Sequence, residues 1–122
     1  MHVAATIAVL LVAALHAYFA WLEMVGWTRP AGRRAFALDH EFAERTKGLA
    51  ANQGLYNLFL VAGLLWSTIA NRAPGPEGRA LACFFLGCVI VAGVFGAVTV
   101  SRRILFVQAL PGAVALALVL AA

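Results

Sequence analysis

Long apolar runs alternate with short polar segments along the chain. Four runs are long enough to span a bilayer: 3–27, 50–71, 79–100 and 104–122. At about 1.5 Å per residue a helix of these lengths covers about 28–38 Å, close to the ~30 Å of a hydrocarbon core. The runs lack the strict alternation of a strand, and a bilayer requires backbone groups to be paired within helices or closed barrels. The pattern predicts an all-α bundle of four transmembrane helices, forming a single domain over 1–122.

The three connecting segments differ in character. The first, "TRPAGRRAFALDHEFAERTKGLA", is long, and the stretch Asp39-His40-Glu41 is placed to cap a helix that continues into the second run. Its apolar residues, among them Phe36 and Phe42, predict that part of it lies at the membrane interface. The second segment, "NRAPGPEGR", predicts a plain turn, and the third, "SRR", a tight hairpin.

Composition supports a membrane location. Hydrophobic residues make up 64% of the chain and charged residues 11%, with a mean hydropathy of +0.93. We therefore interpret the net charge of +4 as a signal of topology, and expect the lipid bilayer and no nucleic acid as a partner. Seven cationic residues lie in the first and third segments and two in the second, which predicts cytoplasmic first and third loops and both termini outside. They are Arg29, Arg33, Arg34, Arg45, Lys47, Arg102 and Arg103 against Arg72 and Arg79. We expect the first run to be retained as a helix, because it lacks a basic start and a good cleavage site.

Polar side chains within the apolar runs gather in the half of the bilayer predicted to be cytoplasmic. Glu23 lies near the end of the first run, and Gln108 lies one turn into the fourth. The start of the second run contributes four more, which are Asn52, Gln53, Tyr56 and Asn57. Because polar groups inside a membrane turn away from lipid, we expect them to enclose a polar cavity open to the cytoplasm.

Helical spacing suggests which faces meet. His16 and Glu23 are seven residues apart and so lie on one side of the first helix. Two stripes of small residues predict close helix packing and a homo-oligomer, a dimer or a trimer. They are Cys88, Ala92, Gly96 and Thr99, and Gln108, Pro111, Gly112 and Ala115. Cys83 and Cys88 lie about 140° apart on one helix, so we expect no disulfide between them.

The same residues suggest a binding site. Glu23 would supply charge, the polar residues of 52–57 would supply donors and acceptors, and Arg45 or Arg103 would anchor an anionic group. If the site is catalytic, Tyr56 or His16 could donate or accept a proton while Arg103 steadies an anion. A purely structural role, in which the polar groups only join helices, stays open. The sequence contains no Gly-rich phosphate-binding loop and no nucleophile elbow, and it leaves any cofactor unknown.

A metal site has little support. His40 and Glu44 are four residues apart on one helical face, a spacing that can hold a metal. Nothing in the sequence supplies a complete set of ligands, and a solvated, capped helix start explains the pair.

Several stretches carry a resemblance to a known family. "LHAYFAWLEMVGW", "KGLAANQGLYNLFLVAGLLW" and "FFLGCVIVAGVFGAVTVSRRILFVQALPG" resemble the Domain of Unknown Function 1304 family of small bacterial membrane proteins. The ANQG-x-YN and V-x-VSR-x-I-x-x-VQ-x-LP blocks are its most specific parts. The resemblance implies a four-span protein of the bacterial inner membrane and assigns no catalytic residue.

Two better-understood groups give alternatives for the activity. "RTKGLAANQGLYN" is loosely similar to the second-helix pattern of the membrane-associated eicosanoid and glutathione metabolism proteins, which implies a glutathione- or lipid-metabolising enzyme. "AWLEMVGWT" is similar to the glutamate-bearing first helix of small multidrug resistance transporters, which implies proton-coupled transport. A structural accessory protein is the third alternative.

Overall fold

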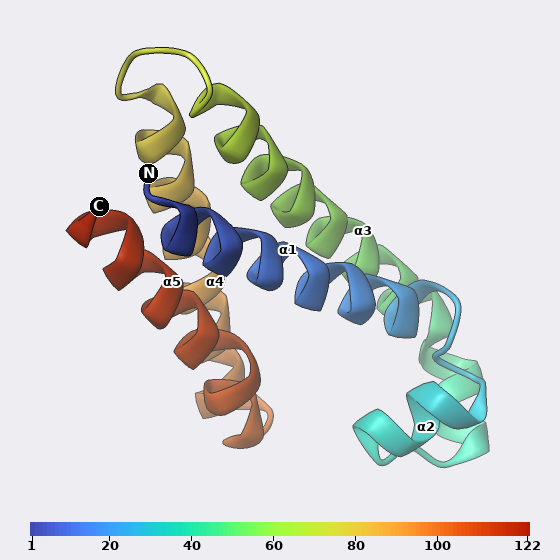
Figure 1. Ribbon diagram of the computed structural model, residues 1–122. Helices are drawn as coiled ribbons and strands as arrows, with labels where there is room; N and C mark the ends of the chain where they lie inside the picture. The colour runs from blue at the N-terminus through green and yellow to red at the C-terminus, as the bar shows by residue number, and fades with distance from the viewer. The chain divides into compact units, whose positions relative to one another are not determined.

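The computed structural model describes all 122 residues, and the chain is entirely helical (Figure 1). The helices are α1 (Val3–Met24), α2 (Pro30–Phe36), α3 (His40–Ala70), α4 (Glu77–Thr99) and α5 (Leu110–Ala121), with a π-helical segment η1 (Leu105–Ala109) before α5. The chain divides into two compact units, one of Met1–Ala13 with Ala62–Ala122 and the other of Ala14–Val61.

The all-α prediction is confirmed, and three of the predicted spans appear as long apolar helices. α1, α3 and α4 are long and apolar enough to cross a membrane. The fourth apolar helix, Leu105–Ala121, is shorter than these three. At 31 residues α3 is about 46 Å long, so it exceeds a hydrocarbon core by about ten residues.

The start of α3 follows the sequence prediction. The backbone N–H of Phe42 donates to Oδ1 of Asp39 at 2.7 Å, which satisfies one of the free donors of the first turn. From there the helix runs without interruption to Ala70. The predicted capped helix that continues into the second span is therefore confirmed.

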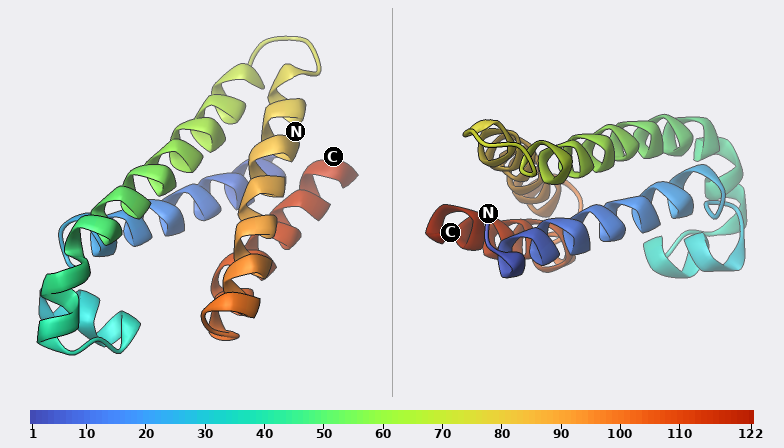
Figure 2. Two further views of the ribbon diagram at one scale, coloured as in Figure 1. Left: turned by 180° about the vertical axis from the view of Figure 1, so that it is seen from behind. Right: turned by 45° about the horizontal axis from the view of Figure 1, so that its top comes forward.

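The segment between α1 and α3 folds back on itself through short contacts. Gly32 donates its backbone N–H to the carbonyl of Gly26 at 3.0 Å, and the two backbones lie too close for a side chain on Gly32. The indole N–H of Trp27 donates to Oγ1 of Thr46 at 3.0 Å, and its ring lies 4.9 Å from that of Phe36. These contacts attach α2 to the first turns of α3, beside which it lies in both views of Figure 2.

α4 packs against η1 and α5 through small residues (Figure 2). Gly93 is buried, and a Cβ built on it would lie 2.5 Å from the backbone nitrogen of Ala109. Gly112 likewise lies against Val89, with 2.9 Å between a built Cβ and the Cγ1 of that valine. The two helices approach this closely because at each contact one of them has a glycine, with no side chain to hold the other helix away.

The contacting face of α4 differs from the predicted small stripe. Gly96 does contact the partner helix, at Ile104. Ala92 and Thr99, however, are exposed, and the Thr99 hydroxyl donates within its own helix to the carbonyl of Phe95 at 2.7 Å. The face is turned by one residue because Gly93 allows a closer backbone approach than Ala92. The prediction for α5 is better, since Gly112 and Ala115 are both buried.

The π-helical segment has a local cause. Leu110 donates its N–H to the carbonyl of Leu105, five residues back, which is the π-helical pattern. Pro111 follows and has no N–H for the carbonyl four residues before it. The widened turn thus precedes the position where the α-helical ladder loses a donor.

The end of α5 is held by a side chain from α4. The Arg79 guanidinium donates to the carbonyls of Leu120 and Ala122, at 2.9 and 3.2 Å. These carbonyls have no partner within α5, so the contact satisfies the free acceptors of its last turn. Cys83 and Cys88, which also lie on α4, are free thiols.

Candidate functional site

Glu23 and Asn57 form a hydrogen-bonded pair between α1 and α3. The amide Nδ2 of Asn57 donates to Oε1 of Glu23 at 2.5 Å. Glu23 is only 3% exposed although it carries a carboxylate. A buried carboxylate requires a donor, and the side chain of Asn57 supplies one.

Gly54 explains how α1 and α3 come close enough for that pair. A Cβ built on Gly54 would lie 3.1 Å from the carbonyl oxygen of Ala20 and 3.2 Å from Cβ of Glu23. Gly54 and Asn57 are three residues apart and share the face of α3 that meets α1. The ANQG-x-YN block therefore contains both the contact glycine and the donor.

His16 lies on the same side of α1 as Glu23, as the spacing predicts. Both side chains are buried, His16 at 0% exposure, and the His16 ring makes an edge contact with Phe19 at 5.4 Å. Gln53 is four residues before Asn57 and borders the same face of α3, but it is exposed. His16 and Glu23 are thus the buried polar side chains on this side of α1, and the half-buried Asn57 is the hydrogen-bond partner of Glu23.

Asn52 and Tyr56 lie on the other side of α3. Gly54 and Asn57 face α1, and Asn52 and Tyr56 are rotated from Gly54 by about 160° in opposite directions around the helix. Both are exposed, Tyr56 at 60%, and the Tyr56 ring makes an edge contact with Phe59. The sequence predicts these residues and Glu23 in one cavity; in the structure Asn52 and Tyr56 lie on the side of α3 away from Gly54 and Asn57, which face α1.

Arg45 belongs to this second, exposed face. It precedes Asn52 by seven residues and Tyr56 by eleven, and these spacings return to within about 20° of the same direction. All three side chains are exposed, and Leu49 between them is also exposed. We refer to Arg45, Asn52 and Tyr56 as the polar stripe of α3.

The other predicted site residues belong to the unit that contains α4 and α5. Arg103 is exposed in the turn before η1, where its backbone N–H donates to Oγ of Ser101 at 3.3 Å. Gln108 is half-buried within η1. Glu23 and Tyr56 belong to the other unit, so the expectation that Arg103 and Gln108 share a site with them stays a prediction.

His40 and Glu44, the two residues whose spacing could hold a metal, lie at the exposed start of α3. Glu44 forms an ion pair with Lys47, with 3.1 Å between Oε2 and Nζ. No group of three or more His, Cys, Asp and Glu side chains is arranged to hold a metal ion. The arrangement of His40 and Glu44 is that of a solvated helix start.

The described features define a class of protein. The chain consists of apolar helices, three of them long enough to cross a membrane, and one pair carries a buried carboxylate with an amide partner. This combination is that of a multi-pass helical membrane protein, in which buried polar groups are paired within the protein.

The chain belongs to the DUF1304 family. The family model, described as "Protein of unknown function (DUF1304)", matches residues 10–120. No curated protein and no solved structure matches the chain. The resemblance found in the sequence is thus confirmed over nearly its whole length.

Proposed function

We propose that this is an inner-membrane protein that binds a small amphiphile with an anionic group on the polar stripe of α3. One observation carries the proposal: Asn52 and Tyr56 are exposed on a helix whose sequence from Ala50 onward is apolar. Hydrocarbon disfavours such side chains unless water, protein or a ligand meets them. A polar stripe on an apolar helix is therefore expected to be covered.

The stripe offers an order of chemical groups that fits an amphiphile. Arg45 lies in the charged first turns of α3, where its guanidinium can bind a carboxylate or phosphate through two parallel hydrogen bonds. Asn52 follows about 10 Å along the axis and offers an amide, and Tyr56 follows about 6 Å further with a hydroxyl. Leu49 and Phe59 supply apolar surface beside them for the chain of the ligand.

Glu23 and Asn57 have a supporting role in this proposal. They are paired with each other and covered, so they hold α3 against α1 with the polar stripe turned outward. A carboxylate can accept several hydrogen bonds, so Glu23 keeps the capacity to accept one from a ligand if the helices separate. Catalytic roles for Tyr56, His16 or Arg103 are not part of the proposal.

The predicted orientation places Arg45 in the cytoplasm, and cysteine labelling can test it. In a chain with Cys83 and Cys88 replaced by Ala, we introduce cysteine at Ala31 or Gly75, both exposed. A membrane-impermeant maleimide added to intact cells is expected to modify the variant at position 75 and spare the one at position 31. The reverse pattern would place the stripe on the outer side.

Ligand binding can be tested with the purified protein and three probes. Laurate represents an anionic amphiphile, glutathione a thiol peptide and tetraphenylphosphonium a transported cation. We expect laurate to raise the thermal midpoint of the wild-type protein. Arg45→Gln should weaken laurate binding about tenfold, the contribution of one charge-assisted hydrogen bond, and Asn52→Ala and Tyr56→Phe should each weaken it less.

A matched control shows whether a loss of laurate binding is specific to the polar stripe or follows from the loss of any exposed arginine. Arg34 is an exposed arginine on α2, and Arg34→Gln should leave laurate binding unchanged. If this control loses as much affinity as Arg45→Gln, the site is not on the stripe. Stabilisation by glutathione or tetraphenylphosphonium alone would favour the enzyme or the transporter alternative.

A second copy of the chain could cover the same face, and the predicted homo-oligomer would then rest on it. The small residues of α4 and α5 that suggested self-association are largely used within the chain, as at Gly93 and Gly112. Native mass spectrometry from lipid distinguishes the two cases. A dimer or trimer that Asn52→Ala and Tyr56→Phe dissociate, without any response to laurate, would make the stripe a subunit interface.

A further inference from the structure

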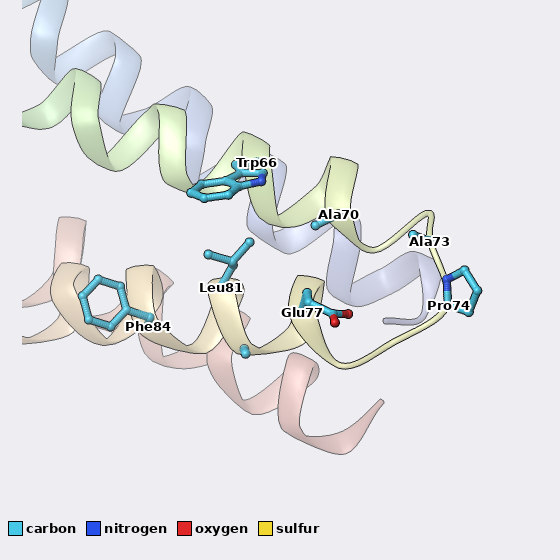
Figure 3. Close-up of a pocket in the computed structure, with 8 residues that line it drawn as sticks. Trp66, Ala70, Ala73, Pro74, Glu77, Leu81 and Phe84 are labelled. Carbon is cyan, nitrogen blue, oxygen red and sulfur yellow. The ribbon is translucent and has the colours of Figure 1, made fainter.

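An open groove of about 710 Å³ lies beside the turn that joins α3 to α4 (Figure 3). Its lining residues all belong to the unit that contains α4 and α5. Trp66, Leu81 and Phe84 are the large apolar side chains of its lining, and the two aromatic ones, Trp66 and Phe84, are well exposed, at 59% and 65%. The volume lies within the range of small-molecule sites.

Glu77 is the charged residue of the lining, and it lies at the end of the groove next to the turn (Figure 3). Its carboxylate folds back over Gly75, whose backbone has a φ of +138° and leaves no room for a side chain there. The nearby Arg79 instead donates to carbonyls at the end of α5. The one ion pair in the structure is that between Lys47 and Glu44, and Glu77 takes part in none. The carboxylate of Glu77 therefore has no cationic partner.

The groove therefore has a negative end and an apolar end. Glu77 and Phe84 are seven residues apart on α4, a distance of about 10 Å along the helix. Trp66 lies one turn before Ala70 near the end of α3, and tryptophan is enriched at the level of membrane headgroups. An amphiphile lying in the groove would place its head at the turn and its chain along the aromatic side chains.

We propose that this groove binds an amphiphile with a positively charged amine head. The ammonium group pairs with the Glu77 carboxylate, and the apolar chain lies against Trp66, Leu81 and Phe84. Charge complementarity selects this occupant, because an anionic head would be repelled by Glu77 and a neutral one would gain nothing from it. The site is separate from the polar stripe of α3 in its residues and opposite in the charge it prefers.

The test compares dodecylammonium with dodecanol, which has the same chain and no charge. Binding to the full-length protein in nanodiscs is followed by thermal shift and titration. We expect dodecylammonium to bind more tightly than dodecanol, and Glu77→Gln to weaken it about threefold, to the affinity of dodecanol. Ala80→Trp, which fills the groove, should weaken both probes.

Glu41→Gln is the matched control. Glu41 is also an acidic residue in the first turn of a long helix, α3, but it lies outside the groove, so its variant should bind dodecylammonium as the wild type does. Equal affinity for the two probes, or equal losses in the Glu41 and Glu77 variants, would overturn the proposal. If Ala80→Trp fails to fold, the comparison of Glu77→Gln with Glu41→Gln still tests whether the groove binds the ammonium head. Laurate binding unchanged in Glu77→Gln separates this result from the test of the polar stripe.

Discussion

Replacing Gly93 by Ala is expected to destabilise the protein by about 1–3 kcal/mol, the usual effect of overfilling a packed contact. The added Cβ would lie 2.5 Å from the backbone nitrogen and 2.9 Å from Cα of Ala109. Backbone atoms cannot rotate away as a flexible side chain can, so α4 and η1 must separate. This loss should exceed the gain of about 1 kcal/mol that alanine normally brings to a helix interior. Unfolding in mixed detergent micelles measures the difference.

Gly87 gives the control on the same helix. A Cβ built on Gly87 meets nothing within 4 Å, so Gly87→Ala should stabilise the protein by up to about 1 kcal/mol through helix propensity alone. The two substitutions are chemically identical, and opposite signs are expected. Equal stability changes at both positions would show that the close contact between Gly93 and Ala109 does not hold the helices together.

Replacing Asn57 by Leu is expected to cost about 1–3 kcal/mol of folding free energy, because it leaves the buried carboxylate of Glu23 without its donor. Leucine has a similar size and suits an apolar helix, so the loss reflects the hydrogen bond and not the packing. Thr68→Val is the control on α3, since the Thr68 hydroxyl bonds only to the carbonyl of Leu65 in its own helix. That variant should change stability by less than about 0.5 kcal/mol.

A double-mutant cycle shows whether Glu23 and Asn57 act as a pair. In Glu23→Leu with Asn57→Leu both polar partners are gone, so the double variant should be more stable than the sum of the two single losses predicts. The coupling energy should fall between about 0.5 and 3 kcal/mol. Additive losses would mean that the hydrogen bond between the two side chains contributes nothing to stability.

The long helices could be predicted from the sequence with few errors, whereas the short α2 was not predicted. Apolar runs gave α1, α3 and α4, and the stretch Asp39-His40-Glu41 gave the start of the helix that becomes the second span, with Asp39 as the cap in the structure. These features depend on local properties, namely hydropathy over a run and the chemistry of a cap. The π-helical turn before Pro111 escaped prediction, because a proline indicates a lost hydrogen bond but not how the preceding turn adjusts.

The faces of the helices were harder to predict, and the candidate site depended on them. The sequence places Asn52, Tyr56 and Asn57 within six residues, all at one depth, but it does not say which of them meets α1. The glycines decide that question, because Gly54 permits the approach of Ala20 and Glu23 and so directs Asn57 inward. A search for glycine within the polar block could have separated Asn57 from the other two.

The length of α3 has a consequence for where the protein sits in a membrane. Its first ten residues carry four charged side chains, and only from Gly48 onward is the helix free of charge. A thinner bilayer can be accommodated by tilting the rod, whereas a thicker one would have to draw Lys47 into hydrocarbon. The charged start of α3 therefore limits how deeply the helix can enter the membrane from that side. In a thick membrane, the bilayer around the helix is expected to become thinner.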